Sequence, residues 1–323
     1  MAIRLKSIFF YAICIVFFSS CNAQDDATAQ IVPDFTTEEQ EIIRQAAYFS
    51  TDQGYTWTPM TKGLPGYTEG SFLDTFGEEL LLATDNVGLF VTTNGRSQWK
   101  NISGQLPSSK INAIWTEGEQ IYAGVYKAGI YTTDDLGKTW TDITYNLDDK
   151  RVQAIRIING RLYVGTDSGI AKLNPKTQTW IPLYTGTQIL SLEHLDGRII
   201  AGASRGTLIS TQNDTDWQWA NEYGAVHYTR LLDETIFALQ INGNLHRSTD
   251  LGSSWQNISY QPQQRSYIYE VVGIGDELIL SNNHGLHRSS DNGQSWKLYQ
   301  PNTDYFYFDI IEVDGILYST TRN

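Results

Sequence analysis

The chain has 323 residues, of which 36 are acidic and 23 basic, so its formal net charge at pH 7 is −13. An acidic balance argues against nucleic-acid binding, which depends on basic surface patches. The length and the 41% hydrophobic content allow a sizeable packed core.

Residues 1–20 have the pattern of a secretory signal. Arg4 and Lys6 precede an apolar run that is too short to span a membrane as a helix. The letters FSSC that follow resemble a bacterial lipobox, which implies cleavage before Cys21 and a lipid on that residue. Phe18 stands where this motif usually has Leu, and the alternative is an ordinary signal with an incidental cysteine. Removing the segment takes the formal charge to −15.

Residues 21–37 are polar and short of large apolar side chains, which predicts a flexible, lipidated tether. The spacing of Thr36 and Glu39 is typical of a capping box and predicts a short helix at the start of a domain covering residues 38–323. Cys14 leaves with the signal, so the mature protein has one cysteine and no internal disulfide.

A repeat of about forty residues organises the rest of the chain. Each repeat has one tryptophan at an equivalent position, such as Trp140. In five repeats a glycine lies eleven residues before this tryptophan. The repeat tryptophans are Trp57, Trp99, Trp140, Trp180, Trp217, Trp255 and Trp296.

Each repeat reads as four short strands. In residues 111–146, INAIWTEG is followed by EQIYAGVY, GIYTTDDLGKTW and TDITYN, with a hairpin signal between the first two runs. Such repeats predict an all-β protein, a seven-bladed β-propeller of four-stranded antiparallel blades. GILYSTTRN, at the end of the chain, corresponds to the second strand of a repeat, and AAYFSTDQGYTW begins at the third. One blade is therefore predicted to combine strands from both ends, which removes an open sheet edge.

Four repeats carry the phrase Ser/Thr-x-Asp-x-Gly-x-Thr/Ser-Trp between the third and fourth strands. We expect its Asp to accept hydrogen bonds from backbone N–H groups two and three residues on, its Gly to adopt a positive φ, and its Trp to be buried under the turn. Four copies are typical of a structural role rather than a catalytic one. The paired residues are Asp52 with Trp57, Asp135 with Trp140, Asp250 with Trp255 and Asp291 with Trp296.

This phrase resembles the Asp box, or bacterial neuraminidase repeat, and the resemblance covers nearly the whole mature chain. The Asp-box propellers include sialidases, xyloglucanases, sortilin-type receptors and the photosystem II assembly factors. Fold alone does not fix function within such a group.

The enzyme members of this group need particular residues at their sites. Sialidases carry an Arg-Ile-Pro or similar motif, whereas the nearest match here, IRIING, lacks the Pro. Two carboxylates in a central pocket would serve a glycosidase. Asp85 and Asp167 are the best candidates for that pair, and solvated loop aspartates are the alternative reading.

No cofactor or metal site is predicted. His284 and His287 lie three residues apart, a spacing that points them to opposite faces of a strand. The Asp boxes lack the number of ligands that a calcium loop has.

The loops opposite the Asp boxes are therefore the candidate ligand-binding surface. They carry basic side chains that would favour an anionic ligand or an acidic peptide, although ordinary solvated loop charges are equally consistent with the pattern. The candidates are Lys110, Lys127, Lys150, Arg151, Arg205, Arg265, His284 and Arg322, partly offset by Asp85, Asp149, Asp167 and Asp304.

The resemblance to the photosystem II assembly factors implies a non-catalytic, membrane-associated scaffold that binds a partner protein. The hypothesis from sequence is thus a monomeric cell-envelope lipoprotein, lipid-anchored at the outer membrane or cell surface, whose loops bind a protein or glycan. A carbohydrate-active enzyme is the alternative, followed by a purely structural envelope protein. Arginines meeting in the mouth would favour binding, and two facing carboxylates in a deep pocket would favour the enzyme.

Overall fold

A computed structural model describes residues 46–322, apart from 212–213, 223, 259–265 and 302–305 and the side chains of Phe306 and Arg322. The signal, Cys21, the tether and the predicted helix start at Thr36 lie outside the described residues. So do Arg265, Asp304 and the side chain of Arg322.

The described residues form seven sheets of four antiparallel strands, which we number as blades 1 to 7. Blade 1 is β3 (Gly70–Phe76), β4 (Glu79–Thr84), β5 (Leu89–Thr93) and β6 (Gln98–Asn101). Blade 2 is β7 (Ile111–Glu117), β8 (Gln120–Val125), β9 (Gly129–Thr133) and β10 (Thr141–Asp142). Blade 3 is β11 (Val152–Ile158), β12 (Arg161–Thr166), β13 (Gly169–Asn174) and β14 (Thr179–Thr185).

The remaining blades repeat this order. Blade 4 is β15 (Ile189–Leu195), β16 (Arg198–Ala203), β17 (Gly206–Ser210) and β18 (Trp217–Asn221). Blade 5 is β19 (Val226–Leu232), β20 (Thr235–Gln240), β21 (Leu245–Ser248) and β22 (Gln256–Asn257). Blade 6 is β23 (Ile268–Ile274), β24 (Glu277–Asn282), β25 (Gly285–Ser289) and β26 (Lys297–Pro301). Blade 7 is β27 (Phe306–Val313), β28 (Ile316–Arg322), β1 (Ala47–Ser50) and β2 (Thr58–Pro59).

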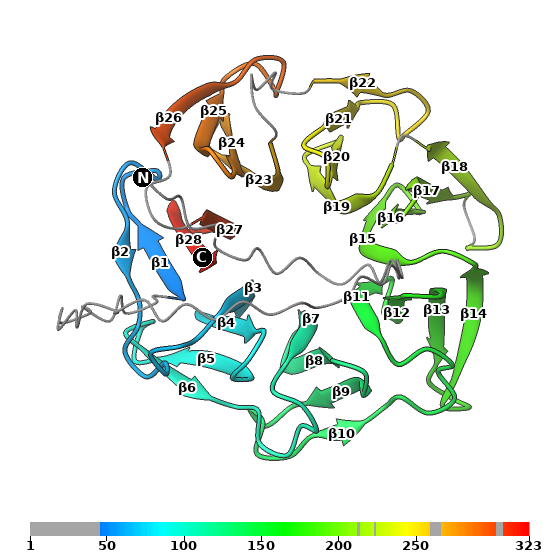
Figure 1. Ribbon diagram of the computed structural model, residues 1–323. Helices are drawn as coiled ribbons and strands as arrows, with labels where there is room; N and C mark the ends of the chain where they lie inside the picture. The colour runs from blue at the N-terminus through cyan, green and yellow to red at the C-terminus, as the bar shows by residue number, and fades with distance from the viewer. Residues whose placement is uncertain (1–45, 212–213, 223, 259–265, 302–305, 323) are drawn as a thin grey trace, which may run out of the picture. The chain divides into compact units, whose positions relative to one another are not determined.

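The first strands of the blades surround the axis of the ring, a region that we call the channel. Each first strand contacts the first strand of the next blade, and β27 contacts β3, so the ring closes. Figure 1 shows β3, β7, β11, β15, β19, β23 and β27 around the centre. The predicted seven-bladed propeller is confirmed.

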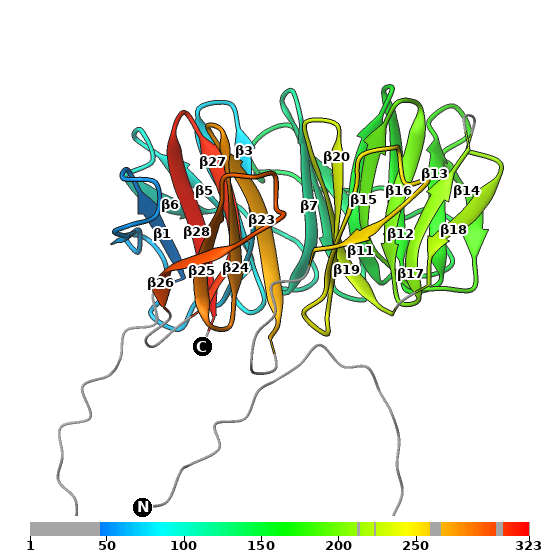
Figure 2. The same ribbon diagram turned by 90° about the horizontal axis from the view of Figure 1, so that it is seen from above.

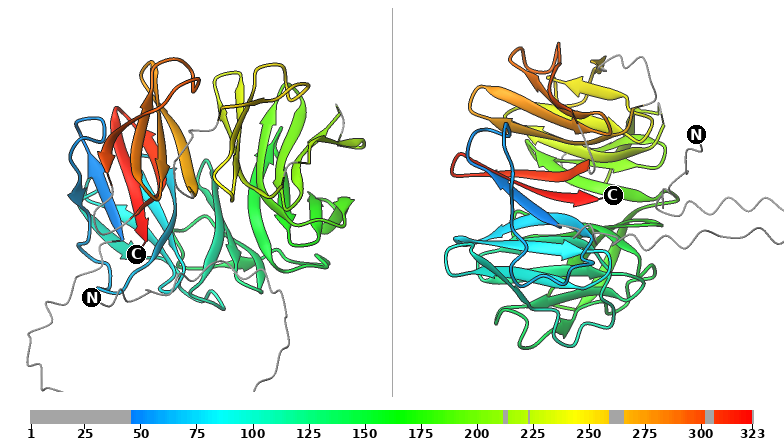
Figure 3. Two further views of the ribbon diagram at one scale, coloured as in Figure 1. Left: turned by 45° about the horizontal axis from the view of Figure 1, so that its top comes forward. Right: turned by 60° about the vertical axis from the view of Figure 1, so that its left-hand side comes forward.

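Blade 7 joins strands from both ends of the described chain, as predicted. Its order is β2-β1-β28-β27, and Ala47 pairs with Thr320 while Ser50 pairs with Leu317. The views in Figure 3 agree that β1 lies beside β28. This pairing satisfies the backbone groups that would otherwise leave an exposed sheet edge.

The hydrophobic core lies between adjacent blades. The second strands are buried on both faces because a neighbouring blade covers each face. In β4, every residue after the first, LLLAT, is buried. Between blades 2 and 3, for example, Ile130 and Ile143 pack with Val152 and Val164.

The turn into the third strand requires glycine in blades 1 and 2. Gly88 and Gly129 both have φ of 100°, which favours glycine. A Cβ on Gly88 would lie 1.9 Å from Ser103 Oγ, and one on Gly129 would lie 2.2 Å from Thr144 Oγ1. These glycines are therefore fixed by backbone conformation and by close packing.

The four Asp boxes share one hydrogen-bond pattern. In the first, Ser50 Oγ accepts the Gly54 N–H at 2.7 Å and donates to Asp52 at 2.8 Å. Asp52 accepts the backbone N–H of Thr56 at 2.8 Å and its hydroxyl at 2.6 Å. The main donor is the fourth residue and not the second or third as expected, because the turn brings the fourth residue back over the carboxylate. The third residue adds a backbone hydrogen bond in the boxes of Asp135 and Asp291. These donors lower the pKa of each box Asp to about 2.

The box glycines have positive φ, as predicted, but the box tryptophans are only half-buried. Trp57 and Trp255 donate to carbonyls of their own turns at 3.1 Å. The most buried repeat tryptophans, Trp99 and Trp180, are each 3% exposed and lie in blades without a box. Their indole N–H groups donate to the preceding blade at 2.8 and 2.9 Å, as that of the box tryptophan Trp140 also does, to the Ile102 carbonyl at 2.9 Å.

The strand order gives the ring two unlike faces, seen edge-on in Figure 2. The loop face carries the segments between second and third strands and between successive blades. In six blades the segment between the second and third strands donates a backbone N–H to the segment that leads into the blade. In blade 2, for example, the Tyr126 N–H donates to the Lys110 carbonyl at 3.0 Å. The box face carries the turns between first and second strands and the third-to-fourth turns that include the Asp boxes.

Charge is distributed unequally between these faces. On the described loop face the two signs balance: the cations are Lys62, Lys110, Lys127, Lys150, Arg151 and Arg205, and the carboxylates are Glu69, Asp85, Asp148, Asp149, Asp167 and Glu222. On the box-face turns, carboxylates greatly outnumber cations. The carboxylates are Glu78, Glu79, Glu117, Glu119, Asp196, Asp233, Glu234, Asp276, Glu277, Glu312 and Asp314, with Asp52, Asp134, Asp135, Asp214, Asp216, Asp250 and Asp291. The cations there are Arg96, Lys138, Arg161, Lys176 and Arg198. Three more reach these turns from third strands: Lys172 bonds Asp214, Arg247 bonds the Asn292 carbonyl, and Arg288 bonds Glu277 and the Gln53 carbonyl.

Candidate functional site

An exposed tyrosine flanked by two lysines lies on the loop face of blade 2. The ammonium groups of Lys110 and Lys127 lie 5.2 and 5.0 Å from the centre of the Tyr126 ring, within the range of cation–π attraction. The tyrosine remains 38% exposed. It follows β8 directly, and its N–H is held by the chain that leads into β7, so its position is set by the blade itself.

Two more exposed tyrosines lie on the same face over neighbouring blades. Tyr67 precedes β3 and is 64% exposed, and Tyr145 lies between β10 and β11 and is 42% exposed. The side-chain amide of Asn86 donates a hydrogen bond to the Tyr67 carbonyl at 2.7 Å, which fixes the segment that leads into β3. Exposed tyrosines with basic neighbours are typical of protein-binding surfaces.

A network around Arg151 continues this surface over blade 3. The guanidinium contacts Asp149 at 2.9 Å and Asp167 at 3.2 Å. Gln153 and Gln188 donate to Asp167 at 2.8 and 2.7 Å. These contacts orient Arg151 while leaving its side chain 48% exposed.

The structure brings the other described candidates to the loop face as well. Lys110 pairs with Asp85 at 3.4 Å and Arg205 with Glu222 at 2.5 Å. Lys150 is exposed beside Arg151, and His284 is half-buried after β24. The basic side chains are therefore interleaved with carboxylates, and the described loop face offers mixed charge rather than a purely cationic surface.

The central channel holds charged residues that sequence reasoning missed. Arg156 of β11 pairs with Glu193 of β15 and lies 4.2 Å from the Trp115 ring of β7. Arg230 of β19 pairs with Glu270 of β23, its Nε donating at 2.7 Å.

The Arg230 pair extends to the ring closure. The guanidinium also lies 3.7 Å from Asp309 of β27, and Asp309 accepts the backbone N–H of Leu73 at 2.6 Å. This connected set therefore joins blades 5, 6, 7 and 1 around the channel.

The sequence contains a pattern that could have identified these charged residues on the first strands. Asp74, Arg156, Glu193 and Arg230 each occupy the fifth position of a seven-residue first strand that is otherwise largely apolar. A charge recurring at one register position of an inner strand indicates a shared polar channel.

Burial changes the acidity of the channel carboxyls. It raises the pKa of Glu270 to about 7 and that of Asp74 to about 6, with nearby arginines opposing the effect. Burial also raises the pKa of Asp309. Glu270 and Asp74 therefore exchange protons near neutral pH.

Neither carboxylate pair forms an open catalytic site. Asp85 and Asp167 lie on blades 1 and 3, each beside its own cation. Glu270 and Asp309 share Arg230 but are 1% and 4% exposed. Glycoside hydrolysis needs carboxylates that can reach a sugar, whereas these are covered and committed to protein donors.

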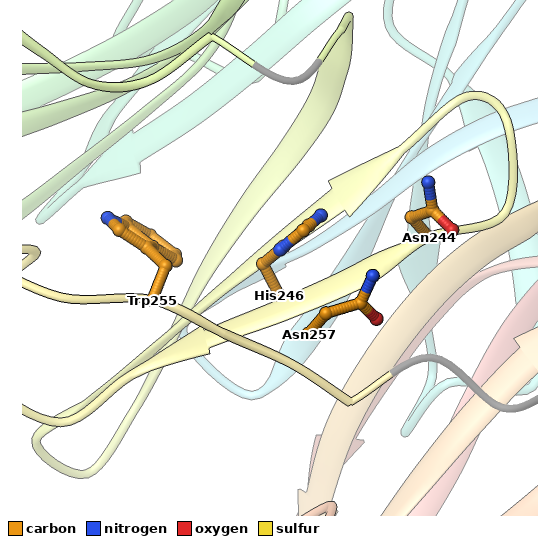
Figure 4. A pocket seen from close by; sticks show the side chains of 4 residues that line it. All are labelled: Asn244, His246, Trp255 and Asn257. Carbon is orange, nitrogen blue, oxygen red and sulfur yellow. The ribbon is translucent and has the colours of Figure 1, made fainter.

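A separate hollow of about 350 Å³ lies on the outer strands of blade 5. Figure 4 shows the side chains that line it, Asn244, His246, Trp255 and Asn257, projecting from the β21–β22 ribbon. His246 and Asn257 are cross-strand partners. Burial lowers the pKa of His246, which favours the neutral imidazole.

Among the described residues, no group of three or more His, Cys, Asp or Glu side chains is placed to hold a metal ion. No helix in that part of the chain combines the length and apolar character needed to cross a bilayer.

Comparison with known proteins supports the architecture. The chain matches the BNR/Asp-box repeat family over residues 48–59, the box of blade 7. No curated protein sequence matches the chain significantly.

Solved structures with the same fold include three proteins of different description. The extracellular domain of the hybrid two-component system BT4673 from B. thetaiotaomicron has a TM-score of 0.65 at 12% identity, over 81% of this chain and 39% of that one. Ycf48 bound to a D1 peptide has a TM-score of 0.62 at 18% identity, over 79% and 93%. PorZ, a surface component of the type-IX secretion system of Porphyromonas gingivalis, has a TM-score of 0.56 at 14% identity, over 75% and 34%. This chain thus spans about two fifths of the solved extracellular chain of BT4673 and about a third of PorZ, and these likenesses establish the fold.

Proposed function

We propose that this protein is a cell-envelope lipoprotein whose propeller binds a segment of a partner protein at the loop face, without catalysing a reaction. The observation that carries the proposal is Tyr126, exposed between Lys110 and Lys127. A rigid aromatic ring with flanking ammonium groups can pack on apolar side chains of a partner and attract its carboxylates, at little conformational cost.

The surrounding surface supports a protein ligand. Tyr67 and Tyr145 extend the aromatic area over blades 1 to 3, and Arg151 adds a half-exposed guanidinium held by two carboxylates. Interfaces between proteins combine aromatic anchors with a polar rim in this way. A glycan remains the alternative ligand in the same place.

The solved structures add independent support. Ycf48, which this chain matches over 93% of the Ycf48 chain, was solved with a D1 peptide bound. We infer that this propeller also takes a peptide segment, while its sequence differs too much to transfer the partner itself.

The envelope location is proposed from the sequence. The lipobox-like letters before Cys21 imply a lipid anchor, and the acidic residues after it favour export to the outer membrane or surface. Mass spectrometry of the N-terminal peptide from the native membrane tests this part, with Cys21→Ser as the soluble control.

A photo-crosslinking experiment tests the binding proposal. A photoreactive phenylalanine analogue replaces Tyr126, and in a matched protein it replaces Tyr55, a tyrosine on the box face that is 56% exposed. We expect one envelope protein to be captured from position 126 and not from position 55, and to bind the purified propeller. Capture from neither position in the native envelope would remove the protein-partner proposal, and glycans would then be screened for retention and hydrolysis.

A further inference from the structure

We propose that the charge asymmetry of the ring orients it over an anionic membrane, with the loop face toward the lipid and the box face away. The proposal rests on the tethered scaffold proposed above and specifies its partner. The loop face then meets protein segments close to the bilayer, such as the extramembrane loops of an integral membrane protein.

The first observation is the excess of carboxylates on the box face. Exposed members such as Glu119, Glu234 and Asp276 project from the turns between first and second strands, and the Asp boxes add more on the same side. On the described loop face, cations and carboxylates balance. Turning the box face toward anionic lipid would therefore bring many like charges to the surface, while turning the loop face toward it would bring none in net terms.

The distance between the faces makes this difference effective. The second strands that run from one face to the other have six residues in blades 1 to 6 and seven in blade 7, and six residues correspond to about 20 Å. The Debye length at physiological salt is about 8 Å, so charges across the ring are screened to roughly a tenth at the far face. Each face therefore interacts with a membrane largely through its own charges.

The third observation is the place where the chain enters the ring. Ala46, the first described residue, precedes β1, and its carbonyl accepts the N–H of Thr321 at 3.2 Å. It also lies within 2.6 Å of the position that a Cβ on Gly70 would take, at the loop-face start of β3. Ala46 therefore lies on the loop face, the side that the electrostatic preference turns toward the lipid.

An energy-transfer experiment with a matched pair of labels tests the orientation. Without residues 1–21 the chain has no cysteine. The protein from residue 22 onward is held by an N-terminal histidine tag on vesicles containing a nickel-chelating lipid, so native lipidation is not required. Lys150→Cys labels the loop face and Lys176→Cys the box face of the same blade, with equal changes of charge. The acceptor is a fluorescent lipid headgroup.

On vesicles of equimolar phosphatidylglycerol and phosphatidylcholine, we expect stronger transfer from position 150 than from position 176. The difference should shrink on phosphatidylcholine alone and at about 1 M salt, where the Debye length is about 3 Å. It should also shrink when Glu78, Glu119, Glu234 and Asp276 are replaced by Lys. Equal transfer from both labels, or a difference unaffected by lipid charge and salt, would overturn the proposal. Capture of a partner at Tyr126 does not depend on this outcome, so the two proposals can fail separately.

Discussion

The channel and the loop face both place arginines beside carboxylates, but the two sets differ in burial and in what they connect. Arg230 in the channel is 26% exposed and contacts Glu270, which is 1% exposed, and these residues come from different blades. Arg151 on the loop face is 48% exposed and contacts Asp149 and Asp167 within blade 3. The channel charges therefore hold blades together, whereas the loop-face charges are available to another molecule.

This difference follows from solvation. A buried charge has already lost its water, so removal of its partner leaves it uncompensated at a cost of about 3–5 kcal/mol. An exposed pair competes with water and contributes about 0–1 kcal/mol. Stability and recognition should accordingly respond to different arginines.

The largest effect is expected from Arg230→Met. The substitution leaves Glu270 and Asp309 without their guanidinium, and we expect the free energy of unfolding to fall by about 3–5 kcal/mol. Urea denaturation followed by tryptophan fluorescence measures it. Adding Glu270→Gln should restore part of the loss, because a neutral amide replaces the stranded carboxylate. A loss below about 1 kcal/mol in the single variant would mean that the channel pair does not hold the blades.

The next effect is a dependence of stability on pH. The folded protein keeps protons on Glu270 and Asp74 up to pH values of about 7 and 6, whereas the unfolded chain releases them near 4.5 and 3.8. The folded state therefore binds more protons in this window, and stability falls as pH rises through it. The box aspartates act oppositely, since their lowered pKa of about 2 stabilises the fold above pH 4 and loses that effect toward pH 2.

Thermal unfolding between pH 3 and 8 measures this dependence. We expect the highest melting temperature near pH 4–5 and a decline toward neutral pH. Glu270 contributes on the order of 3 kcal/mol to the decline, since each unit of pKa corresponds to about 1.4 kcal/mol. Glu270→Gln imitates the protonated form and should flatten the decline. An unchanged slope in that variant would assign the pH dependence to other groups.

Recognition should depend on the loop face instead. Tyr126→Ala is expected to weaken binding of the captured partner by about 30-fold, the effect of a residue worth about 2 kcal/mol at an interface. Its stability should stay within about 0.5 kcal/mol of the parent protein, because the ring is exposed. Calorimetric titration with the purified partner provides the measurement, and Tyr55→Ala is the control. Equal affinities of the two variants would place the interface elsewhere.

The fold was predictable from the sequence because each blade repeats its own local signals. The tryptophan spacing and the strand order of residues 111–146 were sufficient for seven blades, and the relation of GILYSTTRN to AAYFSTDQGYTW was sufficient for the mixed blade. The main donor of the Asp-box hydrogen bonds was predicted wrongly, because the turn is wider than an Asx turn and returns the fourth residue, Thr56, to Asp52.

The site was less predictable because its contacts cross blades. Lys110 and Lys127 were identified by their loops, but Tyr126 between them was not, since cation–π contact depends on how the loops fold. The channel pair of Arg230 and Glu270 joins residues forty positions apart. The sequence showed charged residues within the first strands. Which of them form pairs depends on the register between neighbouring first strands, which the sequence does not give.

The smallest effect is expected from Arg151→Met on the loop face. Its guanidinium is half-exposed and both of its carboxylates keep other donors, Ser168 on Asp149 and two glutamines on Asp167. We therefore expect a stability change below about 1 kcal/mol, which decreases further at high salt because exposed pairs are screened. Denaturation in parallel with Arg230→Met, at low and high salt, measures the contrast. Because the same substitution is made in both places, a loss for Arg151 as large as that for Arg230 would show that exposure does not separate the two sets, and the loop-face network would then have to be regarded as part of the scaffold.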